Sequence, residues 1–310
     1  FITAYEAGQI NITPVTGVDR DKYKENSRIR VLEYVSNEYE FLGFNFENPI
    51  FSGENGAIIR KAIYYGINRQ EIIQKNYLGH ATQNDVPLHP NSYLLSEDAN
   101  KYGYNPAESI DLLKSVNIID RDGDGVVEDK DGNILTFRLV TNPSNLYRQR
   151  VAEMIRDDLM EIGIEVIYDY DNTYEKDISL EQRADEWNKL SSKVSSGDYD
   201  IVLLGWQFSF MPDLYSIYHS TQIGLDNFIS YNNPYMDELL TSVDKAYKRE
   251  EKVSSYEDLQ SFIVDDLPYI SLFYKNKAIL VDNIILGELA PNVANPYNGL
   301  EKCIIALEAD

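Results

Sequence analysis

The sequence is poor in cysteine and in basic residues. Cys303 is the only cysteine among 310 residues, so the chain cannot form an internal disulfide, and its redox compartment cannot be inferred. Lys and Arg number 28 against 51 Asp and Glu, and the formal net charge is -23. A chain this acidic is poorly suited to bind nucleic-acid phosphates or an anionic membrane surface. We expect the charge to form a solvated acidic surface.

Long apolar runs and the common catalytic motifs are also absent. No apolar run approaches the roughly 18 residues that a membrane-spanning helix needs. His80, His89 and His219 have no metal-ligand spacing, and no G-x-S-x-G, H-E-x-x-H or phosphate-cradling glycine loop occurs. We therefore expect no enzymatic activity and no required cofactor. A glycoside hydrolase stays an alternative, since that chemistry needs only two carboxyl groups about 5–10 Å apart.

Hydrophobic residues, at 43%, are sufficient for a folded core. Alternating apolar residues predict strands at 29–34 and 41–46, separated by a break at 36–38. A helix with 3.6-residue periodicity follows from about Ala57, and a second is expected to begin at Arg69 and to stop at Gly79. Asn68 and Glu71 have the spacing of a capping box for this second helix.

The segment from 134 to 206 alternates between strand and helix patterns. Strands are predicted at 134–140 and 164–168, and a continuous apolar strand at 200–206. A helix that Ser144 caps and Gly163 ends connects the first two strands, and a polar helix lies within 172–197. Two successive crossovers of this kind predict a partly parallel sheet.

One acidic loop has the spacing of a calcium-binding loop. Oxygen-bearing side chains stand at loop positions 1, 3, 5, 9 and 12, with glycine at position 6. The candidate ligands are Asp120, Asp122, Asp124, Glu128 and Asp131. Ca²⁺ prefers six to eight oxygen ligands, which such a turn supplies, so Ca²⁺ is a possible ion here. The alternative is an acidic β-hairpin, because Asp-Gly pairs form turns without metal, and the strand pattern that follows leaves no exit helix.

A loop rich in aromatic residues follows the apolar strand at 200–206. Ligands of α/β sheets bind outside the carboxyl ends of strands, so this loop is the candidate ligand site. Its exposed rings would stack on or enclose a ligand, although Trp206 could equally pack the core. The candidate ligand-binding residues are Trp206, Phe208, Ser209, Phe210, Asp213 and Tyr215.

Several phrases of the sequence resemble one protein family. FNFENPIFSGENGAIIRKAIYYGINRQEII is similar to the pattern N-x-x-x-P-P-F…V-R-x-A-x-x-x-A-I-D-R-x-x-I of family-5 extracellular solute-binding proteins, the oligopeptide, dipeptide and nickel binders of ABC importers. The matching residues are Asn45, Pro49, Phe51, Arg60, Ala62, Ile67 and Arg69. YNPAESIDLLKSVN and YNNPYMDELL are similar to further phrases of this family.

The resemblance implies an α/β fold of the periplasmic-binding-protein-like type II (class C), with the C-terminal lobe plus the returning part of the first lobe. Residues 1–40 would end a first-lobe segment and cross the hinge, 41–270 would form the C-terminal α/β lobe, and 271–310 would return to the first lobe. YEAGQINITPV, near the start, resembles a phrase that usually lies halfway along the family's chains. We therefore expect an N-terminal half of comparable size to be missing.

The resemblance also implies the substrate-binding component of an ABC importer, which captures a peptide or related solute in a cleft between lobes. Its partners would be that small-molecule or peptide ligand, the importer permease and the missing N-terminal half. The expected location is extracellular, at the cell surface or in the periplasm, with a lipid anchor on the missing N-terminus.

The aromatic loop departs from the pattern of the family's peptide binders. In those proteins an Asp of this loop pairs with the α-amine of the ligand, whereas Ser209 or Phe210 falls at that place here and Asp213 matches a later acid. A charge-assisted bond to an ammonium group is therefore not evident. An oligosaccharide-binding member of the same fold is the alternative, because aromatic rings suit sugar faces. From other classes, the hydrolase and a calcium-stabilised adhesion or scaffold module stay open.

Overall fold

The computed structural model describes residues 1–15, 17–169, 178–209 and 211–306. A mixed seven-stranded sheet, in the order β1-β7-β2-β6-β4-β5 with β3 also on β7, runs through the molecule, and β8 pairs with β9 apart from it. The strands are β1 Ile12–Val15, β2 Ile29–Phe44, β3 Ala81–Gln83, β4 Thr136–Val140, β5 Glu165–Tyr168, β6 Ile201–Gln207, β7 Tyr269–Asp282, β8 Ile285–Leu286 and β9 Ile304–Ile305.

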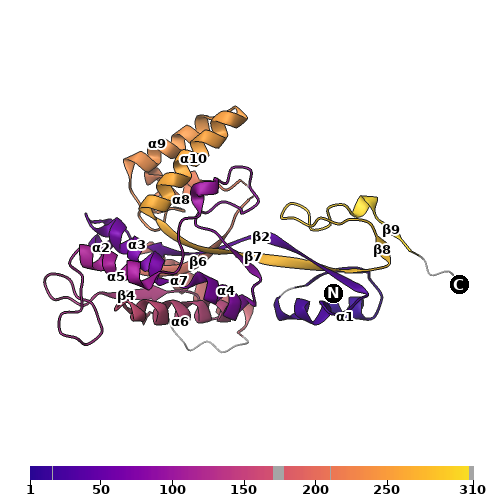
Figure 1. Cartoon of the computed structure of the whole chain (residues 1–310), viewed down its shortest axis with the longest axis horizontal. Helices are drawn as coiled ribbons and strands as arrows, with labels where there is room; N and C mark the ends of the chain where they lie inside the picture. The colour runs from indigo at the N-terminus through magenta and orange to yellow at the C-terminus, as the bar shows by residue number, and fades with distance from the viewer. Residues whose placement is uncertain (16, 170–177, 210, 307–310) are drawn as a thin grey trace.

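Helices cover both faces of this sheet: α8, α9 and α10 lie above it in Figure 1, and α4 and α6 lie beneath it. The α-helices are α1 Ile2–Glu6, α2 Pro49–Ser52, α3 Gly56–Gly66, α4 Arg69–Tyr77, α5 Pro106–Ser115, α6 Leu146–Glu161, α7 Leu180–Ser195, α8 Leu214–Tyr218, α9 Pro234–Lys245 and α10 Arg249–Asp266. Short 3-10 helices are η1 Gly17–Tyr23, η2 Glu97–Ala99, η3 Ser220–Gln222 and η4 Leu300–Lys302. No described helix is long and apolar enough to cross a membrane.

The parallel strands agree with the pattern predicted from the sequence. β4 pairs in parallel with β5 and with β6, while β2 is antiparallel to both β6 and β7. Residues Ile201 to Leu204 of β6 are all buried, as expected of a strand covered on both faces. The carboxyl ends of β4, β5 and β6 therefore meet at one edge of the sheet, where the loop after β6 begins.

The two strands predicted at 29–34 and 41–46 form one strand, so the predicted break at 36–38 was wrong. β2 has 16 residues, and its pairing with β7 changes register between Val35 and Tyr39. The polar residues Ser36 to Glu38 form this irregularity instead of ending the strand, because a bulge accommodates extra residues within a ladder. β2 and β7 together make a long ribbon that extends beyond the helical body (Figure 1).

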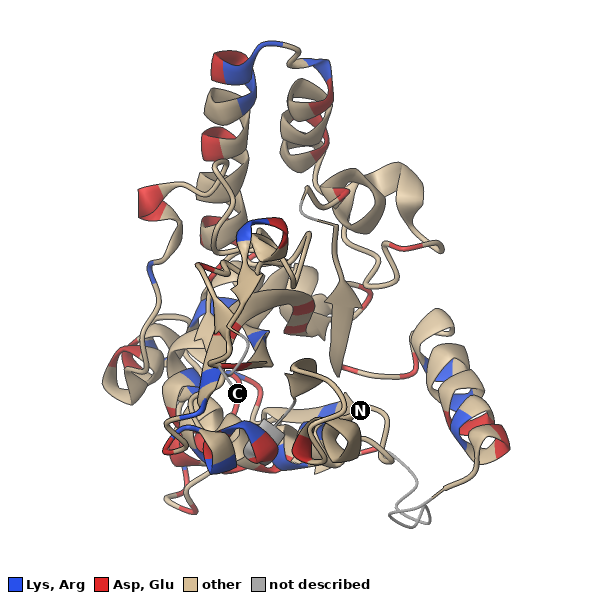
Figure 2. Cartoon of the chain, turned by 90° about the vertical axis from the view of Figure 1, so that its right-hand side faces the viewer, with Lys and Arg blue, Asp and Glu red and all other residues tan. Residues whose placement is uncertain are grey.

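Buried apolar residues form one large cluster and two small ones. The large cluster lies between the sheet and its helices, whereas the small clusters cover the two faces of the outer half of β7. One contains Ala278 and Leu280 and the other Ile279 and Val281, as the alternation of a strand requires. Figure 2 shows the charged residues mainly on helices and loops, with the central strands largely free of them.

Asparagine side chains cap the N-termini of several helices, and two of the predicted helix caps differ in the structure. Asn68 accepts a hydrogen bond from the Glu71 N–H at 3.1 Å, but the backbone N–H of Asn68 donates to Asp158 of α6 and not to Glu71. The predicted capping box is therefore only half formed. Asn145, not Ser144, caps α6, because the Ser144 N–H and hydroxyl both donate to Glu186 of α7.

Candidate functional site

Trp206 lies at the end of β6 within a layer of stacked aromatic rings. Its ring centroid is 6.3 Å from that of Phe41 and 6.3 Å from that of Phe208, and both pairs are nearly parallel. Phe41 stacks in turn on Tyr269 at 4.2 Å. Trp206 is half-buried, so one part of its indole packs this layer and another part reaches the surface.

Phe208 is more buried than the sequence suggested. The predicted loop was expected to be exposed, yet the Phe208 side chain is only 8% exposed and its ring centroid lies 5.4 Å from that of Tyr39. Its backbone N–H donates to the Asn37 carbonyl at 3.1 Å, which ties the start of the loop to the bulge of β2. The buried Phe208 ring therefore anchors the start of the loop on β2.

The remaining loop residues lie farther along the chain, near α8 and α9. Asp213 caps α8 by accepting from the Ser216 N–H at 3.2 Å, and the Tyr215 ring stacks on His219 at 4.1 Å. Both line a hollow of about 230 Å³ beside α9, which Trp206 and Phe208 do not line. The exposed Ser209 hydroxyl donates to the carbonyl of Met211, while Phe210 lies outside the described residues. The structure thus divides the predicted ligand residues into two groups.

A larger cavity, of about 480 Å³, lies on the other face of the sheet between β2, β7, α4, α6 and η1. Five of its described lining residues are basic and two are acidic, which contrasts with the net charge of -23 of the chain. The basic residues are Arg20, Lys75, Arg150, Lys275 and Lys277, and the acidic ones are Asp19 and Glu38. No local sequence pattern marks this cavity, because its residues come from five separate segments.

Ion pairs engage the three lysines and Arg20 of this cavity. Lys75 pairs with Glu71, and Arg20 Nη1 lies 3.1 Å from Glu33. Lys277 Nζ lies 2.7 Å from Glu38, and Lys275 Nζ lies 2.7 Å from Glu40 and 3.7 Å from Glu38. Burial disfavours the ionised form of Glu38, but Lys277 and Lys275 outweigh burial and lower its pKa. Glu38 is therefore a carboxylate at neutral pH, and its charge offsets part of the positive charge of the cavity.

Several buried polar atoms at this cavity have no hydrogen-bond partner among the described residues. They are Arg20 Nε, Asn76 Oδ1 and the Tyr77 hydroxyl. Arg20 is only 1% exposed, and its Nη2 donates to the Asn276 carbonyl at 2.9 Å. Buried polar groups are usually hydrogen-bonded, so these atoms are exceptions within the residues that line the cavity.

The cavity and the aromatic loop lie on opposite faces of the same strands. Glu38 lines the cavity and pairs in register with Gln207, while the next pair along β2 and β6 is Tyr39 with Trp206. Successive side chains of a strand point to opposite faces, so the adjacent residues Glu38 and Tyr39 face the two different sites.

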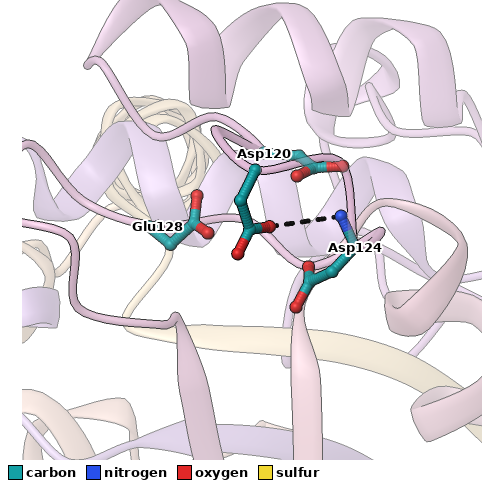
Figure 3. Close-up of side chains that lie close together, drawn as sticks. Asp120, Asp124 and Glu128 are labelled. Carbon is teal, nitrogen blue, oxygen red and sulfur yellow. Dashed lines mark hydrogen bonds between the residues drawn. The ribbon is translucent and has the colours of Figure 1, made fainter.

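The acidic loop brings together four of its five predicted ligands. Carboxylate oxygens of Asp120, Asp122, Asp124 and Glu128 lie within 4.8 Å of one another. Figure 3 shows the Asp120 carboxylate between those of Asp124 and Glu128. Asp131 does not belong to this group among the described residues, and its N–H donates to Asp129 in the following turn.

Backbone hydrogen bonds also engage these carboxylates. Asp120 accepts from the N–H groups of Gly123 at 2.7 Å and Gly125 at 3.0 Å, and Glu128 accepts from the Arg121 N–H at 2.8 Å. Glu128 pairs by single bridges with Ile119 and Ile134, as in the hairpin alternative. Calcium binding here stays a prediction.

The histidines occupy structural positions. His80 lies between Asp21 and Glu33, with each ring nitrogen 3.0 Å from a carboxylate oxygen, and it joins η1 to β2. The His89 ring contacts the Val35 carbonyl at 3.2 Å, and burial lowers its pKa. His219 accepts from the Thr221 N–H at 3.2 Å. These contacts connect loops to strands and helices, and the Thr221 hydroxyl also lies 3.0 Å from His219 Nδ1.

The sequence profile of the bacterial extracellular solute-binding proteins, family 5 (middle region), matches residues 2–224. The chain therefore belongs to this family, whose members are solute-binding proteins of transport systems found outside the cell or in the periplasm, as the sequence phrases predicted.

One curated relative and two solved structures are similar to this chain. The oligopeptide-binding protein AppA of Bacillus subtilis (strain 168) is 28% identical over 292 residues, which cover 92% of this chain and 50% of AppA. The solved structure of B. subtilis AppA in complex with a nonapeptide has a TM-score of 0.72 and 25% identity, covering 98% of this chain and 58% of that one. HbpA2 from Haemophilus parasuis, at 17% identity, has a TM-score of 0.77 and covers 99% of this chain and 56% of its own.

These matches confirm the predicted α/β fold of periplasmic-binding-protein-like structures. The chain spans about half the length of the curated relatives it matches, such as 50% of AppA. The division into a hinge crossover, a C-terminal lobe and a returning segment stays a prediction.

Proposed function

We propose that this chain is part of the substrate-binding component of an ABC importer and that it binds a peptide or a related solute. The basic cavity between β2, β7, α4 and α6 carries this proposal, because it gathers five basic side chains at the strand β2, whose partner β6 leads into the aromatic loop. Cations bind a carboxylate, and aromatic rings cover apolar side chains, so the two groups together suit a peptide.

Family membership supports the same function. The B. subtilis relative is named an oligopeptide-binding protein and was solved with a nonapeptide. The ligand would close between this lobe and a second one, and the closed form would dock on the permease of the importer. In this role the protein binds without turnover, at the extracellular or periplasmic side of the membrane, with a lipid anchor as the family resemblance implies.

An oligosaccharide is the second candidate ligand. The observation that favours it is the aromatic layer around Trp206, together with Ser209 or Phe210 at the place where peptide binders of the family carry an acid. A sugar ring would stack on the exposed part of Trp206 and would not need the basic cavity.

Thermal unfolding against a ligand panel tests these two candidates. The panel contains nonapeptides with a free carboxylate, the same peptides as C-terminal amides, and oligosaccharides, with mass spectrometry to detect turnover. A ligand that binds the native state raises the midpoint by mass action. We expect a shift with the free peptides, and a smaller shift in Arg150→Gln than in the matched control Arg183→Gln on exposed α7.

Each other outcome has a distinct meaning. A shift with sugars alone would replace the peptide by the second candidate. Consumption of a sugar would favour the glycoside hydrolase. A panel in which no compound shifts the midpoint of the natural full-length protein would contradict solute binding of either kind.

A further inference from the structure

A buried carboxylate lies beneath the basic cavity and is not part of its lining. Glu40 of β2 is 3% exposed, and it accepts hydrogen bonds from Arg148 Nε at 2.8 Å and Arg148 Nη2 at 3.1 Å. The same carboxylate lies 2.7 Å from Lys275 Nζ. Glu40 thus joins α6 and β7 through one cation from each.

The two cations of this cluster face the cavity differently. Lys275 lines the cavity, whereas Arg148 is held back by Glu40 and by a 2.8 Å hydrogen bond from its Nη1 to Asn142. Two cations share one carboxylate, so the cluster keeps a net positive charge at the cavity wall. Tyr77 also lines the cavity. Burial raises the pKa of its hydroxyl, and the nearby charge of Glu40 raises it further.

The cluster also reaches the strand that carries the aromatic loop. A Cβ at Gly205 would lie 2.6 Å from Arg148 Nη2 and 3.0 Å from Glu40 Oε1, so the cluster occupies the space that a side chain would fill. Gly205 pairs in register with Glu40 itself. Glu40, Arg148 and the residue before Trp206 are therefore packed as one unit, which links the cavity to the loop.

We propose that Glu40 is a positioning residue that sets the charge selectivity of the solute site, an inference that rests on the proposed function. Glu40 holds Lys275 and neutralises part of the positive charge of the cavity. The cavity then binds a solute with one free carboxylate and does not favour solutes that carry more negative charge. Removing its charge leaves two cations with less compensation. Affinity for an anionic ligand then rises, while affinity for its neutral analogue changes little.

The test compares one nonapeptide with its C-terminal amide, by calorimetry on the natural full-length protein at low and high salt. In Glu40→Gln, we expect the affinity for the free carboxylate, divided by the affinity for the amide, to rise about three- to tenfold. This is the size of effect expected when one unit negative charge is removed near the carboxylate of the ligand. High salt should reduce the gain. Glu153→Gln, on an exposed position of α6, is the matched control for the same change in total charge.

A double variant separates charge from structure. Glu40→Gln with Lys275→Gln removes one charge of each sign, so the affinity ratio should return toward the wild-type value. Weaker binding of both peptides by the same factor in Glu40→Gln, with a lower melting temperature, would make Glu40 a structural residue only and overturn the inference. An unchanged ratio in a stably folded Glu40→Gln would overturn it too. Wild-type protein that binds neither peptide would instead contradict the proposed binding of a peptide, and this inference with it.

Discussion

At the scale of single residues, the acid Asp158 shows how burial changes a side chain's chemistry. Burial, together with the nearby acids Glu71, Glu161 and Asp157, raises its pKa to about 6, against a 2.8 Å hydrogen bond from the Asn68 N–H that favours the charged form. The carboxyl group of Asp158 therefore accepts a hydrogen bond at the N-terminus of α4, in a partly buried site with other acids nearby.

This pKa predicts a pH-dependent effect of Asp158→Asn. The folded pKa lies above the unfolded value of about 3.9, so the stability that Asp158 contributes is present at low pH and is lost as pH rises through about 6. The amide oxygen of Asn can still accept from Asn68. We expect the variant to be more stable than wild type by about 1 kcal/mol at pH 7.5, an amount reduced for partial exposure, and to gain nothing at pH 4.

Urea unfolding at the two pH values measures this difference. Glu153→Gln, at an exposed position of the same helix, is the control for a simple loss of negative charge. If Asp158→Asn were destabilised equally at pH 4 and pH 7.5, the hydrogen bond and not the charge would dominate at this position.

At the scale of elements, the contact between β2, β6 and α6 leaves no room at Gly205. A Cβ there would meet the Tyr39 carbonyl at 2.7 Å and Arg148 Nη2 at 2.6 Å, while a Cβ at Gly103 would have no neighbouring atom within 4 Å. Neither glycine has a positive φ, so space alone distinguishes them.

We therefore expect Gly205→Ala to lose about 1–3 kcal/mol of unfolding free energy, because overpacking forces the strand and the arginine apart. Gly103→Ala should stay within about 0.5 kcal/mol of wild type. Chemical denaturation of both variants gives the comparison. Equal stability of the two would mean that Arg148 moves aside freely, which would also weaken the link between the cavity and the loop.

The acidic loop between α5 and β4 gives a second prediction at this scale. If Ca²⁺ binds the clustered carboxylates, millimolar Ca²⁺ should raise the melting temperature and Asp122→Asn should abolish the rise, because the ion binds the native loop and not the unfolded chain. Asp131→Asn should leave the rise intact, since Asp131 lies outside the cluster although the motif assigns it position 12.

Calorimetric titration of the chelator-treated protein, with Mg²⁺ as the control ion, measures this binding. A melting temperature that is the same with Ca²⁺ and with chelator would favour the acidic β-hairpin that forms without metal. An equal loss in Asp131→Asn would show that the loop rearranges to the spacing of the sequence motif.

At the scale of the whole molecule, the ribbon of β2 and β7 extends from a large core to a much smaller one. The inner part of β7 packs in the large cluster, whereas Ala278 to Val281 pack only in two small clusters. Segments with few apolar contacts open at lower free energy than the core of the same protein.

Hydrogen exchange of the 310-residue chain should therefore be uneven along the sheet. We expect amides at 278–281 to exchange roughly 10- to 100-fold faster than those at 201–204 of β6, although both sets are hydrogen-bonded within the sheet. Mass spectrometry of peptic fragments resolves the two segments. Matching rates with the same denaturant dependence would show instead that the ribbon and the body unfold as one unit.

Local features were predictable from the sequence because they depend on neighbours in the chain. The helical periodicity after Ala57, the cap at Asn68 and the buried strand within 200–206 were predicted from spacing alone. The short phrases of the sequence also indicated the family, which the match over residues 2–224 confirms.

Tertiary structure alone decided which polar side chains meet. The break predicted in β2 became a bulge because β7 pairs on both sides of it, and the half-formed capping box at Asn68 depends on Asp158, which lies 90 residues away. The basic cavity and the buried Glu40 arise from segments far apart in the chain. Sequence periodicity determines which face of an element is buried, but only the packing of elements brings distant charges within reach of one another.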